Sequence, residues 1–211
     1  MLIGAGTLLA FGLVSLGMVC SPGPNMMYLI SRSITQGRLA GIISLAGVVL
    51  GFVVYIVATL VGLIAIFDVV PTLYELLKFA GAVYLLWLAW KAIKPGSSSV
   101  LEPRALTVER PHRLFLMGFL TNILNPKIAV LYVSLLPQFE NPAKGSLLTQ
   151  GISLGITQIT ISFSVNLLIV LTASKIASSF RTRPTWLKIQ KWFMATVLTG
   201  LAVRLVIERQ R

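Results

Sequence analysis

Acidic residues, histidine and cysteine are scarce in this chain, and their scarcity excludes several kinds of site. The sequence holds one cysteine, one histidine and 6 acidic residues. Because Cys20 is alone, we expect no internal disulfide, no paired-cysteine redox site and no cysteine-rich metal site. Acids, histidines and thiols do not cluster within the apolar stretches. The sequence therefore predicts no metal, no cofactor and no transport of metal cations.

A catalytic centre is not expected either, not even that of a membrane-embedded enzyme. Serines in the apolar stretches, such as Ser21 and Ser134, become nucleophiles only beside a base. The single histidine, His112, falls in a predicted loop. The sequence therefore predicts no catalytic residue and no enzymatic activity.

Charge is also scarce, and it is absent from three long stretches. Charged residues make up 11% of the chain, whereas soluble domains carry roughly a quarter. Residues 1–31, 39–67 and 146–174 contain no charge. Each can cross a hydrocarbon core, which needs about 20 helical residues. No Lys or Arg precedes Arg32, so we interpret the first stretch as a mature membrane helix and not as a signal peptide.

The hydropathy pattern predicts an all-α membrane protein with six transmembrane helices, at about 7–30, 39–67, 72–93, 114–139, 146–174 and 187–207. Each half contains a span interrupted by proline, a long uncharged span and a short span bounded by basic residues. Three spans per half is an odd number, so the second half enters from the opposite face, which makes an inverted repeat. We expect one transmembrane domain over residues 1–211. Its first repeat covers about 1–94, a flexible, solvated cytoplasmic linker covers 95–113, and the second repeat covers about 114–211.

The basic residues lie mainly between the predicted spans. The net charge of +12 suggests nucleic-acid binding at first sight, but this placement is typical of topology signals and of contacts with anionic lipids. We therefore expect a lipid bilayer, and no nucleic acid, as partner. The loops after the first, third and fifth spans hold 12 basic residues against 5 on the other side. This asymmetry predicts that both termini are periplasmic.

Two of the predicted spans are interrupted near the midplane of the membrane. Pro22, Gly23 and Pro24 cannot lie in an unbroken helix, so a new helix is expected to begin near Pro24. The fourth span breaks in the same way at Pro126, with Asn125 as the expected N-cap. Each second piece begins near the midplane, so we expect two helix starts with free N–H groups in one region. That region suits a carboxylate.

Lys127 directly follows the second break and lies at membrane depth. Placing a lysine there costs about 3 kcal/mol, which makes it a candidate for binding an anion. The alternative is a structural lysine that caps carbonyl groups or pairs with a buried partner. The apolar stretches contain no acidic residue to pair with it, which favours a bound anion.

Five amide side chains are further candidates for substrate binding. Asn25, Asn122 and Asn125 can bond to a carboxylate or an amino group, or they can satisfy loose backbone at the breaks. Gln158 and Asn166 lie eight residues apart, near one face of the fifth span, and we interpret them as interhelical bonds before ligand contacts. Glycine pairs such as Gly151-x-x-x-Gly155 permit close helix packing and allow a homodimer without predicting one.

Four segments carry a resemblance that covers nearly the whole chain. They are Ser21-Pro22-Gly23-Pro24-Asn25, SRSITQGRLAG (Ser31 to Gly41), LKFAGAVYLLWLAWKA (Leu77 to Ala92) and GFLTNILNPKIAVLYVSLLPQF (Gly118 to Phe139). In order and spacing they resemble the LysE/RhtB family of amino-acid exporters, while the fifth and sixth spans match only in hydropathy.

The resemblance implies export of neutral amino acids, such as homoserine, threonine and leucine, across the bacterial inner membrane, driven by the proton gradient. Matching motif positions imply a core made of Pro22, Gly23, Pro24, Asn25, Asn122, Asn125, Pro126 and Lys127. In the lysine-exporter branch, acidic residues are linked to ion coupling. Here Asp68 and Glu140 lie only at span ends. A basic substrate is therefore disfavoured, and the proton carrier is left open among Lys127, Glu140 and the substrate itself.

Three alternatives stay open from the sequence. They are export of another small metabolite, export of basic amino acids, and a role as a non-transporting subunit of a membrane assembly. The paired helix breaks and the buried lysine both lower stability, and a non-transporting subunit would gain nothing from them. Both features therefore argue against the subunit.

Overall fold

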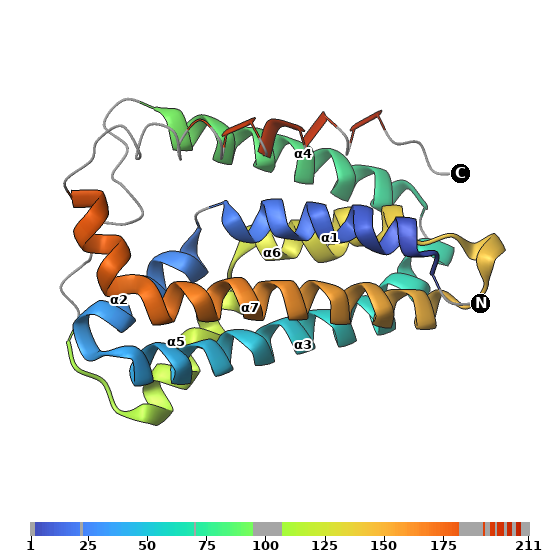
Figure 1. Cartoon of the computed structure of the whole chain (residues 1–211). Coiled ribbons are helices and arrows are strands. Elements are labelled where there is room, and N and C mark those ends of the chain that lie inside the picture. Colours follow the sequence, from blue (N-terminus) through green and yellow to red (C-terminus); the bar gives the residue numbers. More distant parts are fainter. Residues whose placement is uncertain are drawn as a thin grey trace.

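The computed structural model describes residues 3–21, 23–69, 71–94 and 107–181, with scattered helical positions between 192 and 207. All regular structure in these residues is helical (Figure 1), which confirms the all-α prediction. The elements are α1 (Ala5–Cys20), α2 (Pro24–Gln36), α3 (Arg38–Val69), α4 (Pro71–Ile93), α5 (Pro111–Ile123), α6 (Pro126–Val130), a π-turn (Leu131–Leu135), 3-10 turns (Leu136–Phe139 and Pro142–Lys144) and α7 (Leu147–Arg181). Pro22, much of the predicted linker and most of the sixth span lie outside the described residues.

Two of the described helices are long and apolar enough to cross a membrane unaided. These are α3 over Arg38–Gly62 and α7 over Leu147–Ala173, with mean hydropathies of 2.5 and 1.9. Two bent pairs of helices are also long and apolar enough to cross a membrane when each pair is counted as one broken span. They are α1 with α2, and α5 with the segment Pro126–Phe139. The described part therefore contains two to four candidate spans, and the arrangement of six spans as an inverted repeat stays a prediction.

The interruptions fall where the sequence places them. Helix α2 begins at Pro24 and α6 begins at Pro126, each with proline in the first turn, where its missing N–H costs nothing. Asn125 is the N-cap of α6, and its side-chain oxygen accepts the Lys127 backbone N–H at 3.1 Å. These three predictions are confirmed. The hydropathy pattern gave no sign of the π-turn over Leu131–Leu135 that follows α6.

Helix α3 lies against α5 and α7, and its contact with α5 is a contact of backbones. A methyl group added at Gly47 would overlap the Phe115 carbonyl oxygen, and one added at Gly118 would overlap the Ser44 carbonyl oxygen. Only glycine lets the two helices approach this closely. The first piece of the second interrupted span, α5, is therefore fixed against α3.

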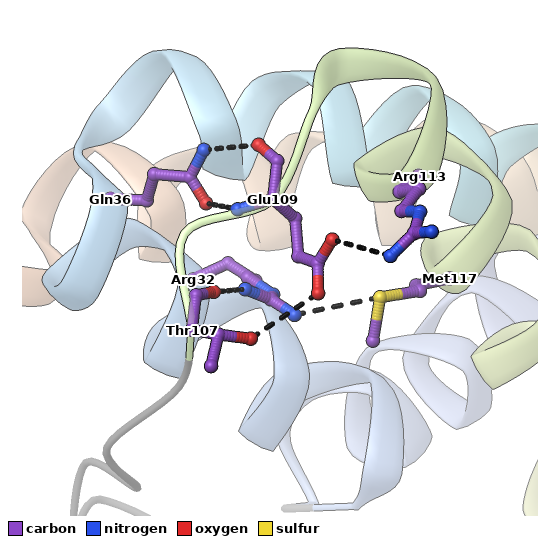
Figure 2. A network of polar contacts seen from close by, with 6 residues as sticks. All are labelled: Arg32, Gln36, Thr107, Glu109, Arg113 and Met117. Carbon is purple, nitrogen blue, oxygen red and sulfur yellow. Dashed lines mark hydrogen bonds and ion pairs between the residues drawn. The ribbon is translucent and has the colours of Figure 1, made fainter.

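The end of the predicted linker is bound to helix α2. The Gln36 side chain donates to the Glu109 carbonyl at 2.5 Å and accepts the Glu109 N–H at 2.9 Å, while Arg32 donates to the Thr107 carbonyl at 2.7 Å (Figure 2). Helix α5 then begins at Pro111, ahead of the predicted start. Most of residues 107–113 are exposed to solvent, as expected of the linker, and residues 107–109 are bonded to α2. The expectation of a flexible loop is wrong for residues 111–113, which form the first turn of α5.

Replacing Gly47 by alanine should lower the melting temperature, because the added methyl overlaps a backbone oxygen of α5. Overpacking of this kind costs about 1–3 kcal/mol. Gly62, also on α3, has nothing within 4 Å of an added methyl, so Gly62→Ala is the matched control and should be neutral or slightly stabilising. Thermal unfolding in detergent checks both variants. An unchanged melting temperature for Gly47→Ala would contradict the backbone contact.

Candidate functional site

A small buried cavity lies where both interrupted spans meet α3 and α7. Its lining residues come from α1, α2, α3, the segment after Pro126, and α7: Ser15, Met18, Val19, Asn25, Met26, Phe52, Asn125, Lys127, Ile128, Leu131, Gln158, Ser162 and Asn166. The cavity volume is about 20 Å³, which is enough for about one water molecule. Five predicted site residues therefore share one cavity: Asn25, Asn125, Lys127, Gln158 and Asn166.

Lys127 holds the broken end of α1. Its side chain is buried, and Nζ donates to the Met18 carbonyl at 2.9 Å and to the Ser21 carbonyl at 2.5 Å. Carbonyl groups at a helix end have no partner in their own helix, and a positive charge stabilises that end. Carbonyl capping, the alternative reading of Lys127, thus accounts for two of its three N–H donors. The third donor is left for a ligand in the cavity.

The two helix starts differ in what they offer to a ligand. In α2 the first bond runs from the Met27 N–H to the Gly23 carbonyl at 3.0 Å, which leaves the N–H groups of Asn25 and Met26 without an acceptor inside the helix. In α6 the N–H of Lys127 is taken by the cap Asn125. The N–H of the following residue, Ile128, is taken by the Asn125 carbonyl. The expectation of free N–H groups is therefore wrong for α6, because the cap satisfies them. For α2 it stays a prediction, because Pro22, which directly precedes Gly23, lies outside the described residues.

Three buried asparagines carry side-chain atoms that lack a partner within the described residues. These atoms are Asn25 Oδ1, Asn125 Nδ2, and both polar atoms of Asn122. A buried polar group left unpaired costs about 1–3 kcal/mol. The first two asparagines line the cavity, so their free acceptor and donor are available to a ligand there. Asn122 is not among the lining residues and lies against Gly51, where an added methyl would come within 2.6 Å of Oδ1.

The α7 wall of the cavity is a bonded chain of polar side chains. Gln158 accepts from the Tyr132 hydroxyl at 2.5 Å and donates to the Ser162 hydroxyl at 2.8 Å, while Asn166 donates to the Ser162 carbonyl at 2.8 Å. Gln158 thus makes an interhelical bond, as predicted, whereas Asn166 bonds within its own helix. Tyr132, Ser162 and the cavity residue Ser15 had no motif to single them out, and their roles follow only from how the helices pack.

The proline and glycine candidates act through the backbone. Pro24 and Pro126 start the second helices, and Gly23 lies so close to Lys127 that an added methyl would be 3.0 Å from Nζ. A cation and unpaired amide groups thus face one cavity between interrupted, apolar helices. Irregular backbone at membrane depth is tolerated where it is enclosed by protein or lines a cavity, and such sites are typical of membrane transporters.

The family follows from comparison with known proteins. The sequence model of the LysE type translocator matches residues 16–209, so the chain belongs to this family, as the resemblance implied. Its members are translocators and not enzymes, which confirms the prediction that the chain is not an enzyme.

Relatives with assigned names are efflux proteins. The homoserine/homoserine lactone efflux protein of Salmonella typhimurium is 34% identical over 74% of this chain and 75% of its own. The leucine efflux protein of Klebsiella pneumoniae is 29% identical over 87% of both chains. The threonine efflux protein of Escherichia coli is 26% identical over 95% of this chain and 98% of its own. No solved structure matches the chain.

Replacing Asn125 by alanine should destabilise the protein by about 1 kcal/mol, because α6 loses the oxygen that caps it. Asn125→Ser keeps a capping acceptor and should recover most of the loss. Thermal unfolding of the two variants in detergent, beside the wild type, measures the difference. If alanine and serine lower the melting temperature equally, capping is not what Asn125 contributes.

Proposed function

We propose that this protein is a secondary active exporter of neutral amino acids or their derivatives, of the homoserine, threonine or leucine kind. It carries them from the cytoplasm across the bacterial inner membrane in exchange for protons. One observation carries the proposal: Lys127 and unpaired amide groups face a single buried cavity between two interrupted helices. The names of the relatives as amino-acid efflux proteins support the substrate class.

The cavity offers complementary groups for a zwitterion. The substrate carboxylate takes the third N–H of Lys127, the free amide of Asn125 and the N–H groups at the start of α2. The substrate ammonium faces the unpaired oxygen of Asn25. The lining contains no acidic residue, so a second positive charge on a basic amino acid would have no partner. Another small metabolite with a carboxylate stays an alternative.

Transport requires the cavity to open and close. A volume of about 20 Å³ holds about one water molecule and no amino acid, so the walls part when the substrate binds. In the proposed cycle, two inverted halves of three spans each rock around the cavity and expose it to one face at a time. Both termini lie in the periplasm in this arrangement. A non-transporting subunit would have no use for unpaired polar groups at the cavity.

The glycine pair Gly151-x-x-x-Gly155, which would allow a homodimer, packs against another helix of the same chain. A methyl at Gly151 would come within 2.5 Å of Leu60, and one at Gly155 within 2.5 Å of Ile56. Both glycines therefore face α3 of the same chain. A homodimer, if it forms, uses a different surface.

Lys127→Ala and Asn25→Ala should both reduce export of neutral amino acids from cells loaded with dipeptides. Loss of a charged hydrogen bond costs about 1.5–3 kcal/mol, so Lys127→Ala should slow export about tenfold or more. Lys144→Ala, at an exposed lysine, is the matched control. Amounts in the membrane fraction are equalised first. Export that is unchanged in both variants would refute the site, and no faster export with the wild type than without it would refute the function.

Glu140→Gln should remove a step near pH 7 from the pH dependence of export. Burial raises the pKa of Glu140 from its ordinary value of 4.5 to about 7. Its carboxyl is therefore neutral below about pH 7 and ionises as the pH rises through that value. Glutamine can neither bind nor release a proton, so export by the variant should be lower than that of the wild type and should no longer change between pH 6 and pH 8. A wild-type step that persists in the variant would eliminate Glu140 as the proton carrier.

A further inference from the structure

Arg32 is a buried cation on α2 with no carboxylate partner in the described residues. Its side chain is 1% exposed. Nη1 donates to the Thr107 carbonyl at 2.7 Å, Nη2 contacts the Met117 sulfur at 3.5 Å, and Nε has no partner in the part of the chain that the structure describes. The Tyr28 ring lies 5.6 Å from the guanidinium carbon. Burying a charge without a counter-ion costs several kcal/mol, and the described residues offer this charge only a carbonyl, a sulfur atom and an aromatic ring.

A carboxylate in the same network pairs elsewhere. Glu109 accepts from the Thr107 hydroxyl at 3.3 Å and from the exposed side chain of Arg113 at 3.5 Å (Figure 2). Among the described residues, the Nε–Nη2 edge of Arg32 therefore meets only a sulfur atom, which is a weak acceptor. That edge is the one that binds a carboxylate through two parallel hydrogen bonds.

Arg32 lies between the cavity and the outside. It follows Asn25 by seven residues on α2, which places it on the same face, about 10 Å further along the helix. Beyond it, residues 107–109 cover this end of α2. We call these residues the strap. They are held to α2 by the Arg32 bond and by the two bonds between Gln36 and Glu109.

We propose that Arg32 is a capture site for the substrate carboxylate at the cytoplasmic mouth of the transporter, reached when the strap lifts from α2. The inference rests on the proposed export of amino acids and adds a second site to it. In the closed arrangement the Thr107 carbonyl oxygen accepts a bond from Arg32 that a substrate carboxylate oxygen would otherwise accept. A carboxylate makes stronger, charge-assisted bonds than a carbonyl. Substrate that binds Arg32 therefore favours the lifted strap and an open mouth.

The test separates recognition of the carboxylate from a structural role. Everted membrane vesicles present the cytoplasmic face to the medium, so uptake gives the KM at that face. Homoserine and leucine carry the carboxylate, whereas homoserine lactone and leucinamide lack it and serve as competitors with measurable inhibition constants. Arg32→Gln should raise the KM for the two amino acids about tenfold. The inhibition constants of the lactone and the amide should stay within about twofold, because neither ligand bonds Arg32 as a carboxylate does.

Two further variants complete the design. Arg38→Gln removes an exposed arginine at the start of α3, outside the strap network, and should leave every constant unchanged. Arg32→Lys keeps the charge but loses the two-donor edge, so it should raise the amino-acid KM less than glutamine does. If Arg32→Gln does not reach the membrane, the lysine variant decides the question. An unchanged KM in that variant would overturn the proposal.

Sidedness distinguishes a capture site from the central cavity. In right-side-out vesicles, exchange measures the KM from the opposite face. Arg32→Gln should leave that KM unchanged, while Asn25→Ala should alter the KM on both faces. A change on both faces in Arg32→Gln, or an equal loss for ligands with and without a carboxylate, would overturn the capture site. Absence of any uptake by the wild type would instead refute the proposed export, and the inference with it.

Discussion

The hydrogen bonds from Lys127 to the end of α1 are the interaction on which the rest of the site depends. Helix α1 ends at Cys20, and carbonyl groups at a helix end need partners from outside their own helix. Lys127 satisfies two of them from more than one hundred residues away in sequence. The same bonds fix both breaks against each other and hold a cation at the cavity. The side chain that closes the interruption is therefore also the one best placed to meet a carboxylate.

Lys127 and Arg32 are buried in the same manner at two depths along the proposed path. Each donates to backbone carbonyls where a buried cation would ordinarily meet a carboxylate. A carbonyl is a weaker acceptor than a carboxylate. The carbonyl bonds therefore satisfy both cations in the folded protein, and a substrate carboxylate can still replace them. On the proposed path an anionic group passes from Arg32 to Lys127. This order requires both the strap and the cavity to open.

The fold divides into contacts that resist movement and contacts that permit it. Backbone lies on backbone where Gly47 and Gly118 bring α3 and α5 together, and no side-chain rotation can relieve that contact. The strap, by contrast, is held by side-chain bonds from α2 in the described part of the chain. Such bonds can break and re-form as rotamers change, whereas the helix pair moves only as a unit. Helix α5, which belongs to one interrupted span, makes the first kind of contact, and helix α2, which belongs to the other, makes the second.

The sequence alone determined the all-α membrane class, the positions of both breaks and the cap at Asn125, because proline geometry and hydropathy are local properties. It also singled out Lys127, since a charge in an apolar stretch is visible without a structure. Only the tertiary structure decided which candidates share a cavity, that α6 has no free N–H groups, and that Asn122 lies apart from the cavity. Arg32 was counted from the sequence as a loop charge, yet it is buried. Burial and partners depend on residues far apart in the chain, and no local pattern contains them.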